Sequence, residues 1–182
     1  MERIIKAVTD KELTPTLDFV EKVFTDSEGP EEGRLVRSLV AEIRSKRYYL
    51  PELDLIMVNE NGEIMGHVMF SRFTIEGRYE DELLILTPVS VKTELQRQHI
   101  SKDLIEYGFE RAKELGYTLC MVEGNPQNYR SRGFQTSADY GVYADESVGL
   151  PAPECLMITE LVPGALDGVS GYVNYGMYET LR

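Results

Sequence analysis

The sequence predicts an α/β protein, with mixed α+β character, in which helices cover both faces of a central mixed β-sheet. Helical and strand-like patterns follow one another along the chain, and the mostly apolar run "ELLILTPVSV" at 82–91 shows no regular alternation of apolar and polar residues. Such a run is typical of a strand buried on both faces. A strand–loop–helix–strand unit over 83–123 predicts a parallel strand pair, whereas the segments before it predict an antiparallel hairpin.

The first 46 residues predict one strand and two helices. Residues 3–8 form a short strand-like run. Apolar residues recur at helical spacing over 13–25 and over 34–46, which predicts two amphipathic helices. Breaker residues between them, including Gly29, indicate a loop over 26–33.

The middle of the chain predicts the hairpin and the crossover unit. Strand-like runs at 53–59 and 63–73 flank Asn61-Gly62, a dipeptide that favours tight hairpin turns. After the long strand, a helix is expected over 101–115. The next strand, a short helix and further strands are expected at 118–124, 125–133, 141–144 and 155–162.

Length and composition limit the classes of protein. The chain has 182 residues, which suits one domain over 1–182. With 42% hydrophobic and 27% charged residues it resembles ordinary globular proteins, and its net charge of −12 argues against nucleic acid and anionic membranes as partners. The acidic balance is compatible with a cationic amine substrate. The sequence leaves a homodimer open.

Cysteine and histidine usage indicates neither a metal site nor disulfides. Cys120 and Cys155 lie in apolar runs, and with His67 and His99 they form no metal-ligand spacing. The first residues lack the apolar stretch of a signal peptide. We therefore expect a cytoplasmic protein with reduced thiols and no metal.

The stretch "TELQRQHISKDLI" at 93–105 has the layout of a phosphate-binding turn, because a polar loop joins a strand to a helix N-terminus. Such a turn favours glycine, yet His99 and Ser101 stand where glycine is expected. Their backbone N–H groups can still donate to an anion. Ser101 is expected to be the N-cap of the helix. Pro88, which has no N–H, indicates a bulge or an edge in the preceding strand.

The stretch from Leu86 to Phe134 resembles the GNAT superfamily of acyl-CoA-dependent N-acyltransferases. The family pattern is an apolar strand ending in Val, about four residues, and then Gln/Arg-x-x-Gly-x-Gly/Ala. Here "KTEL" separates Val91 from "QRQHIS", which keeps Gln96 and departs at both glycines. A second family feature matches Asn125 and "YRSRGF". The tail "LMITELVPGALDGVSGYVNY" resembles a bacterial subgroup of predicted acetyltransferases.

The resemblance implies a GNAT-like fold with a splayed parallel strand pair and acetyl-CoA as cosubstrate. It assigns pantetheine to the edge of one strand, pyrophosphate to the loop and helix N-terminus, and further contacts to the Asn–Tyr segment. The implied cofactor-binding residues are Val89, Ser90, Val91, Gln96, Arg97, Gln98, His99, Ile100, Ser101, Lys102, Asn125 and Tyr129.

The same resemblance implies how acetyl transfer to an amine is catalysed. Tyr129 matches the tyrosine that protonates the leaving thiolate, and the backbone N–H of Val89 or a neighbour can polarise the carbonyl. Glu82 is taken as the general base. The alternatives that remain open are His67, Glu123, Glu160 and a water chain without a dedicated residue.

We therefore expect an N-acetyltransferase that acts on an unknown small-molecule or protein amine. The segments before Gly33 and after Tyr140 are expected to shape the acceptor site. The alternative is a non-catalytic binding or regulatory module of the same fold with an eroded CoA site. The glycine-free loop favours this alternative, whereas Asn125 and Tyr129 favour the enzyme.

Overall fold

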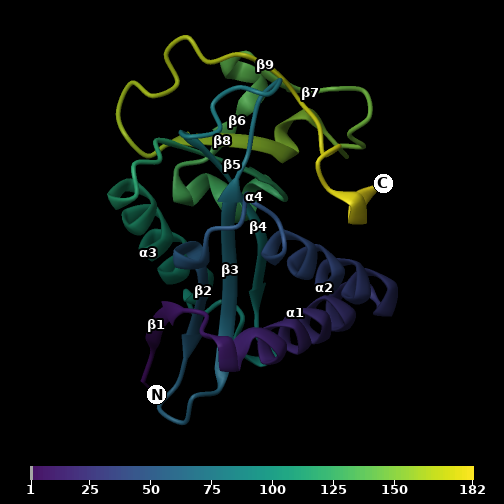
Figure 1. Ribbon diagram of the computed structural model, residues 1–182, viewed down its shortest axis with the longest axis vertical. Helices are drawn as coiled ribbons and strands as arrows, with labels where there is room; N and C mark the ends of the chain where they lie inside the picture. Colours follow the sequence, from purple (N-terminus) through teal and green to yellow (C-terminus); the bar gives the residue numbers. More distant parts are fainter. Residues whose placement is uncertain (1) are drawn as a thin grey trace.

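The structure of the protein is a computed structural model that describes residues 2–182. Within these residues, seven strands form one mixed sheet in the order β1-β2-β3-β4-β5-β8-β6 (Figure 1). Its strands are β1 Ile4–Ala7, β2 Asp54–Val58, β3 Ile64–Arg72, β4 Leu83–Val91, β5 Leu119–Glu123, β6 Gln135–Thr136 and β8 Leu156–Glu160. The predicted α/β class and mixed sheet are confirmed.

Helices cover both faces of this sheet, as predicted. They are α1 Leu13–Glu28, α2 Pro30–Arg44, α3 Ile100–Glu114 and α4 Pro126–Tyr129. Figure 1 shows α1 and α2 on one side of β3 and β4, and α3 on the other. Leu83 and Ile85 join the apolar cluster under α1 and α2, whereas Leu84 and Leu86 join the cluster under α3. The unbroken apolar run of β4 therefore reflects burial on both faces.

The predicted loop over 26–33 is wrong. Helix α1 continues to Glu28 and α2 begins at Pro30, so that Gly29 alone separates them. Gly29 has φ 99°, a left-handed conformation that glycine adopts at little cost, and its N–H donates to the Thr25 carbonyl at 2.9 Å. Pro30 fits the first turn of α2, where an N–H has no intrahelical partner.

The parallel strand pair lies at the centre of the sheet, and it is short. Strands β4 and β5 pair only where Leu83–Ile85 face Leu119–Met121. Beyond Ile85, β4 keeps its antiparallel partner β3 on one edge and loses β5 on the other. Opposite Met69, β4 holds the two residues Thr87 and Pro88, which is the expected bulge. The predicted splayed pair is thereby confirmed.

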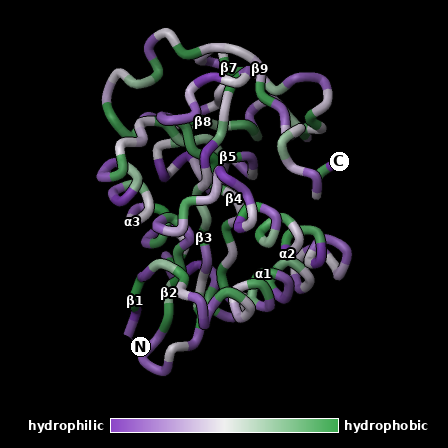
Figure 2. Tube along the Cα trace, viewed as in Figure 1, coloured by the Kyte–Doolittle hydropathy of each residue, from purple (hydrophilic) through white to green (hydrophobic). Residues whose placement is uncertain are grey.

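The C-terminal part of the chain completes the sheet. Strand β8 pairs with β5, and a separate parallel pair joins β7 Val142–Ala144 to β9 Gly171–Val173. In Figure 2 the hydrophobic segments lie along the central strands, while the turn from β2 to β3 near the N-terminus is hydrophilic. Across residues 2–182, no helix has the length and apolar character needed to cross a bilayer.

Candidate active site

A cleft of about 880 Å³ opens where β4 and β5 diverge. Its floor contains Ile85–Val89 of β4, and the end of β5 and α4 form one wall. Residues of α1 and α2 and of the C-terminal tail form the rest, so the two segments expected to shape the acceptor site meet here. Lining residues from α1, α2 and the C-terminal part of the chain are Phe24, Glu28, Glu32, Leu35, Val36, Leu39, Ser147, Val148, Gly149, Tyr175, Gly176, Tyr178, Leu181 and Arg182.

The second half of β4 presents an open backbone edge to this cleft. The N–H of Lys92, just after the strand, donates to the Met65 carbonyl of β3 at 2.9 Å. Because backbone N–H groups alternate between the two edges of a strand, those of Val91 and Val89 point away from β3. Val89 lines the cleft, whereas the side chain of Ser90 is buried. The open edge therefore offers donors to an extended ligand at Val89 and Val91.

The glycine-free loop adopts the backbone shape of a glycine loop. His99 has φ 64° and ψ 19°, and Arg97 also has φ 64°. Few residues other than glycine adopt this left-handed conformation, although His is among those enriched in it. His99 is the N-cap of α3, and Ser101 lies in the first turn, so the prediction that Ser101 is the cap is wrong. The two residues that replace glycine differ because only His99 has a positive φ.

The start of α3 leaves backbone donors available. Its first described intrahelical bond runs from the Asp103 N–H to the His99 carbonyl at 3.0 Å, so the amides before Asp103 have no partner within the helix. Ile100 is buried and anchors the turn, whereas the loop side chains before it, Gln96, Arg97, Gln98 and His99, are exposed. Lys102 is half-buried. The predicted pyrophosphate residues therefore surround one helix N-terminus, where the helix dipole favours an anion.

Arg3 holds this loop in place, and sequence reasoning missed it. Its Nη1 donates to the Gln98 carbonyl at 2.8 Å and lies 3.7 Å from the Asp103 carboxylate. Asp103 in the first turn would repel a phosphate, and the guanidinium of Arg3 offsets that charge. No local sequence signal joins Arg3 to residues almost one hundred positions later, because the contact arises only when the sheet forms.

Tyr129 presents its hydroxyl at the wall of the cleft. Its ring packs edge-on against Phe134, with 5.9 Å between the ring centroids. Gly124 permits this position, since a Cβ there would lie 2.7 Å from Cε2 of Tyr129. Burial raises the pKa of Tyr129 to about 12, and within residues 2–182 its hydroxyl makes no hydrogen bond. The side chain therefore carries a proton at neutral pH, with the oxygen free to meet a ligand.

Asn125 lies in the same wall but already has a structural role. Its Oδ1 accepts the Gln127 N–H at 3.0 Å and caps α4. The cap sets the start of the short helix that ends at Tyr129. Asn125 thus positions Tyr129, and its amide nitrogen remains available to the cleft.

The carboxylates considered as bases lie at opposite ends of β5. Glu82 precedes β4 and Glu160 ends β8, and both lie beside Leu119 at the far end of β5. Neither lines the cleft, so the structure does not place Glu82 where a base is needed. Glu123 does line it and accepts a hydrogen bond from the Tyr175 hydroxyl at 2.6 Å.

His67 belongs to a buried polar cluster in the core. Its Nε2 lies 2.7 Å from Asp54 Oδ1, and the Arg44 Nε lies 2.9 Å from Asp54 Oδ2. Burial alone would raise the pKa of Asp54, but the hydrogen bond to His67 and the charge of Arg44 lower it. The cluster joins α2 to β2 and β3, and His67 has no surface in the cleft. Among residues 2–182, no three His, Cys, Asp or Glu side chains gather closely enough to hold a metal ion.

Comparison with known proteins agrees with this arrangement. A family model described as an acetyltransferase (GNAT) domain matches residues 4–137. The chain is 30% identical over 133 residues to the uncharacterized N-acetyltransferase YjhQ of Escherichia coli K12, covering 72% of this chain and 71% of YjhQ. It is 28% identical over 125 residues to the uncharacterized N-acetyltransferase YhbS of the same strain, covering 68% and 71%.

Two solved structures share the fold. The crystal structure of Escherichia coli YhbS in complex with CoA superposes with a TM-score of 0.85 and 20% identity, covering 100% of this chain and 92% of that one. A GNAT family acetyltransferase from Brucella melitensis in complex with acetyl-CoA gives a TM-score of 0.73 and 22% identity, covering 100% and 99%. Both have the same fold as this chain over its whole length.

Proposed function

Since the chain belongs to the GNAT acetyltransferase family and is an N-acetyltransferase, we propose that it transfers an acetyl group from acetyl-CoA to the amine of an acceptor bound in the cleft. One observation carries this proposal. The open edge of β4 and the unpaired hydroxyl of Tyr129 border the same cleft, whose volume is about 880 Å³. That volume lies within the range of small-molecule sites.

The residues of this chain fit acetyl-CoA at three places. The outward N–H groups of Val89 and Val91 suit the amides of pantetheine, which would add to β4 as an extra strand. The free amides at the start of α3, with Arg97 and Lys102 nearby, suit the pyrophosphate. Asn125 and Tyr129 lie on the wall opposite the open edge of β4.

Acetyl-CoA supplies an acetyl group that is activated as a thioester. Tyr129, neutral because its pKa is about 12, holds a proton that it can donate to the leaving sulfur. The Val89 N–H is directed at the open edge, where it can polarise the carbonyl oxygen. Of the carboxylates predicted as bases, Glu123 lines the cleft. We assign to it the removal of a proton from the acceptor ammonium.

The charges around the cleft favour a cationic acceptor. Glu28, Glu32 and Glu123 contribute carboxylates to its lining, against the single guanidinium of Arg182 within residues 2–182. An ammonium group is attracted to such a surface before it loses its proton. Both a small-molecule amine and a protein amine satisfy this requirement.

The alternative, a non-catalytic module with an eroded CoA site, depended on the missing glycines. His99 already adopts the backbone conformation for which glycine is usually needed. The side chains of residues 96–99 are exposed. These two features support a usable anion site and weigh against the alternative.

Calorimetric titration and thermal unfolding with acetyl-CoA and with free CoA test the proposal. A ligand that binds only the folded state stabilises it by about 2.7 kcal/mol at one hundred times its dissociation constant. We expect both compounds to bind with 1:1 stoichiometry and to compete. If saturating acetyl-CoA produces neither heat nor a thermal shift, the enzymatic proposal fails and the non-catalytic module is favoured.

A further inference from the structure

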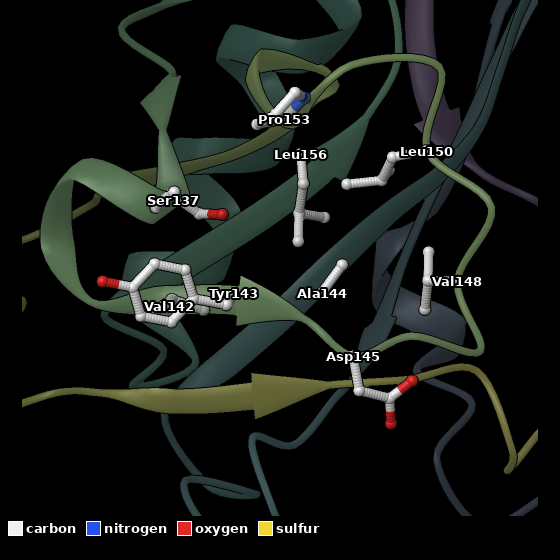
Figure 3. Close-up of a pocket in the computed structure, with 10 residues that line it drawn as sticks. Ser137, Val142, Tyr143, Ala144, Asp145, Val148, Leu150, Pro153 and Leu156 are labelled. Carbon is white, nitrogen blue, oxygen red and sulfur yellow. The ribbon is translucent and has the colours of Figure 1, made fainter.

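A second pocket, of about 300 Å³, lies between the small β7–β9 sheet and β8. Its walls are mostly apolar and include Val142, Ala144, Leu150 and Leu156, with Tyr143 and Asp145 at the edges (Figure 3). At about 30 Å³ for each water-sized atom group, this space holds roughly ten non-hydrogen atoms. The pocket is therefore large enough for a short alkyl or aryl group.

One polar side chain in this apolar wall has no partner. Ser137 is 1% exposed, and its Oγ makes no hydrogen bond within residues 2–182. Figure 3 shows this hydroxyl directed into the pocket toward Leu156. Because a buried hydroxyl without a partner destabilises the folded state, its presence here suits a ligand that supplies an acceptor or donor atom.

The pocket and the cleft share a wall. Val148 lines both, and its neighbours Ser147 and Gly149 line the cleft. Asp145 holds this wall, because its Oδ1 accepts the Ser147 N–H at 2.9 Å and its Oδ2 accepts from Asn174 Nδ2 at 3.0 Å. These hydrogen bonds also lower the pKa of Asp145, so they persist at neutral pH. The side chain of Val148 borders both spaces, so a molecule bound in the cleft lies next to the apolar pocket.

We propose that this pocket receives the apolar end of the acceptor, and that the acceptor is an amphiphilic amine. Its cationic group lies among the cleft carboxylates, and an alkyl or aryl end with a hydrogen-bonding atom reaches Ser137. This inference rests on the proposed function, since it concerns the acceptor of the same reaction. It adds a specificity element that the family assignment does not contain.

The test is a chain-length series of primary amines from propylamine to octylamine with saturating acetyl-CoA. Burial of each methylene contributes about 0.8 kcal/mol, so kcat/KM should rise roughly threefold to fourfold per methylene until the pocket is full. Ala144→Leu fills the pocket and should abolish this rise, so that kcat/KM no longer depends on chain length. Ala152→Leu, which lines neither cavity, is the matched control and should retain the rise.

Ser137→Ala tests the polar contact separately. The variant should unfold at the same temperature as the wild type or higher, since it removes an unpaired buried hydroxyl. The preference for an amine with an ether oxygen near its end, such as 6-methoxyhexylamine, over octylamine, which has the same chain length, should fall at least threefold. An unchanged preference would remove Ser137 from the proposal.

Calorimetry of octylamine without acetyl-CoA keeps the test independent of turnover. Wild-type protein should bind octylamine at least tenfold more tightly than the Ala144→Leu variant. No octylamine binding, or kcat/KM values independent of chain length, would overturn the pocket assignment while the proposed function stands. If acetyl-CoA fails to bind but octylamine binding still depends on Ala144, the proposed function fails and the apolar pocket is upheld.

Discussion

In its first half β4 is enclosed, with Leu83–Ile85 hydrogen-bonded between β3 and β5, whereas in its second half Thr87–Val91 has only β3 beside it. The first half contributes to the apolar clusters on both faces of the sheet. The second half has one open backbone edge and borders the cleft. One strand thus stabilises the fold at one end and offers hydrogen bonds to a ligand at the other, so that changes in the two halves should affect different measurements.

The largest effect is expected from Tyr129, across the cleft from the open half. Tyr129→Phe removes the proposed general acid and should lower kcat by roughly a hundredfold to ten-thousandfold, with the KM for acetyl-CoA nearly unchanged. Because its pKa is about 12, Tyr129 itself should not lose its proton in a pH–rate profile below about pH 11. The control is Tyr107→Phe, at an exposed position on α3. Wild-type kcat in Tyr129→Phe would exclude the acid role.

A change in the enclosed half should instead lower stability. Leu84 is fully buried between the sheet and α3, and Leu84→Ala should lower the free energy of unfolding by about 2–5 kcal/mol. Denaturant titration measures this loss. Val91→Ala, at a half-buried position in the open half, should cost only about 1 kcal/mol. Equal losses at the two positions would contradict the distinction between the halves.

A change in the loop that follows the open half of β4 should alter the affinity of the protein for acetyl-CoA. His99→Gly removes a side chain where the backbone approaches the ligand, and should tighten acetyl-CoA binding by up to about tenfold. It should not destabilise the protein, because a left-handed non-glycine residue costs about 1 kcal/mol or more. Calorimetric titration at matched salt measures the affinity, and Glu106→Gly, at an exposed position further along α3, is the control. Weaker binding by His99→Gly would show that the imidazole contacts the ligand.

The smallest effect is expected at Arg3, which lies just before β1 and supports this loop. Exposed ion pairs contribute about 0.2–1 kcal/mol, so Arg3→Ala should raise the KM for acetyl-CoA roughly twofold to fivefold. Arg3→Lys should recover part of the loss, and high salt should reduce the difference between the variants. Arg111→Ala, at the far end of α3, is the control. An equal rise in the KM of the acceptor amine would indicate a general loss of structure rather than an effect on the loop.

The sequence by itself determined most of the elements and their order, although it missed the short strands β6 and β9. Apolar periodicity identified the first helices, the hairpin and β4, because burial on one face or on both leaves a repeat that is readable along the chain. Pro88 indicated the bulge, and the spacing from the strand to "QRQHIS" predicted an anion site at the start of α3. Tyr129 was found through its spacing to "GF". All these signals lie within short stretches of the chain.

Only the tertiary structure decided which distant residues meet. The sequence favoured Glu82 over Glu123 as the base, although both residues flank strands. Because β4 and β5 are parallel, Glu82 lies at the start of this strand pair and Glu123 at its other end, beside the cleft. It placed the N-cap at Ser101, whereas the structure places it at His99, which has a positive φ that the sequence does not reveal. The contact of Arg3 with Gln98 and the shared wall at Val148 join segments far apart in the chain. Such contacts depend on strand order and layer packing, which leave no local pattern in the sequence.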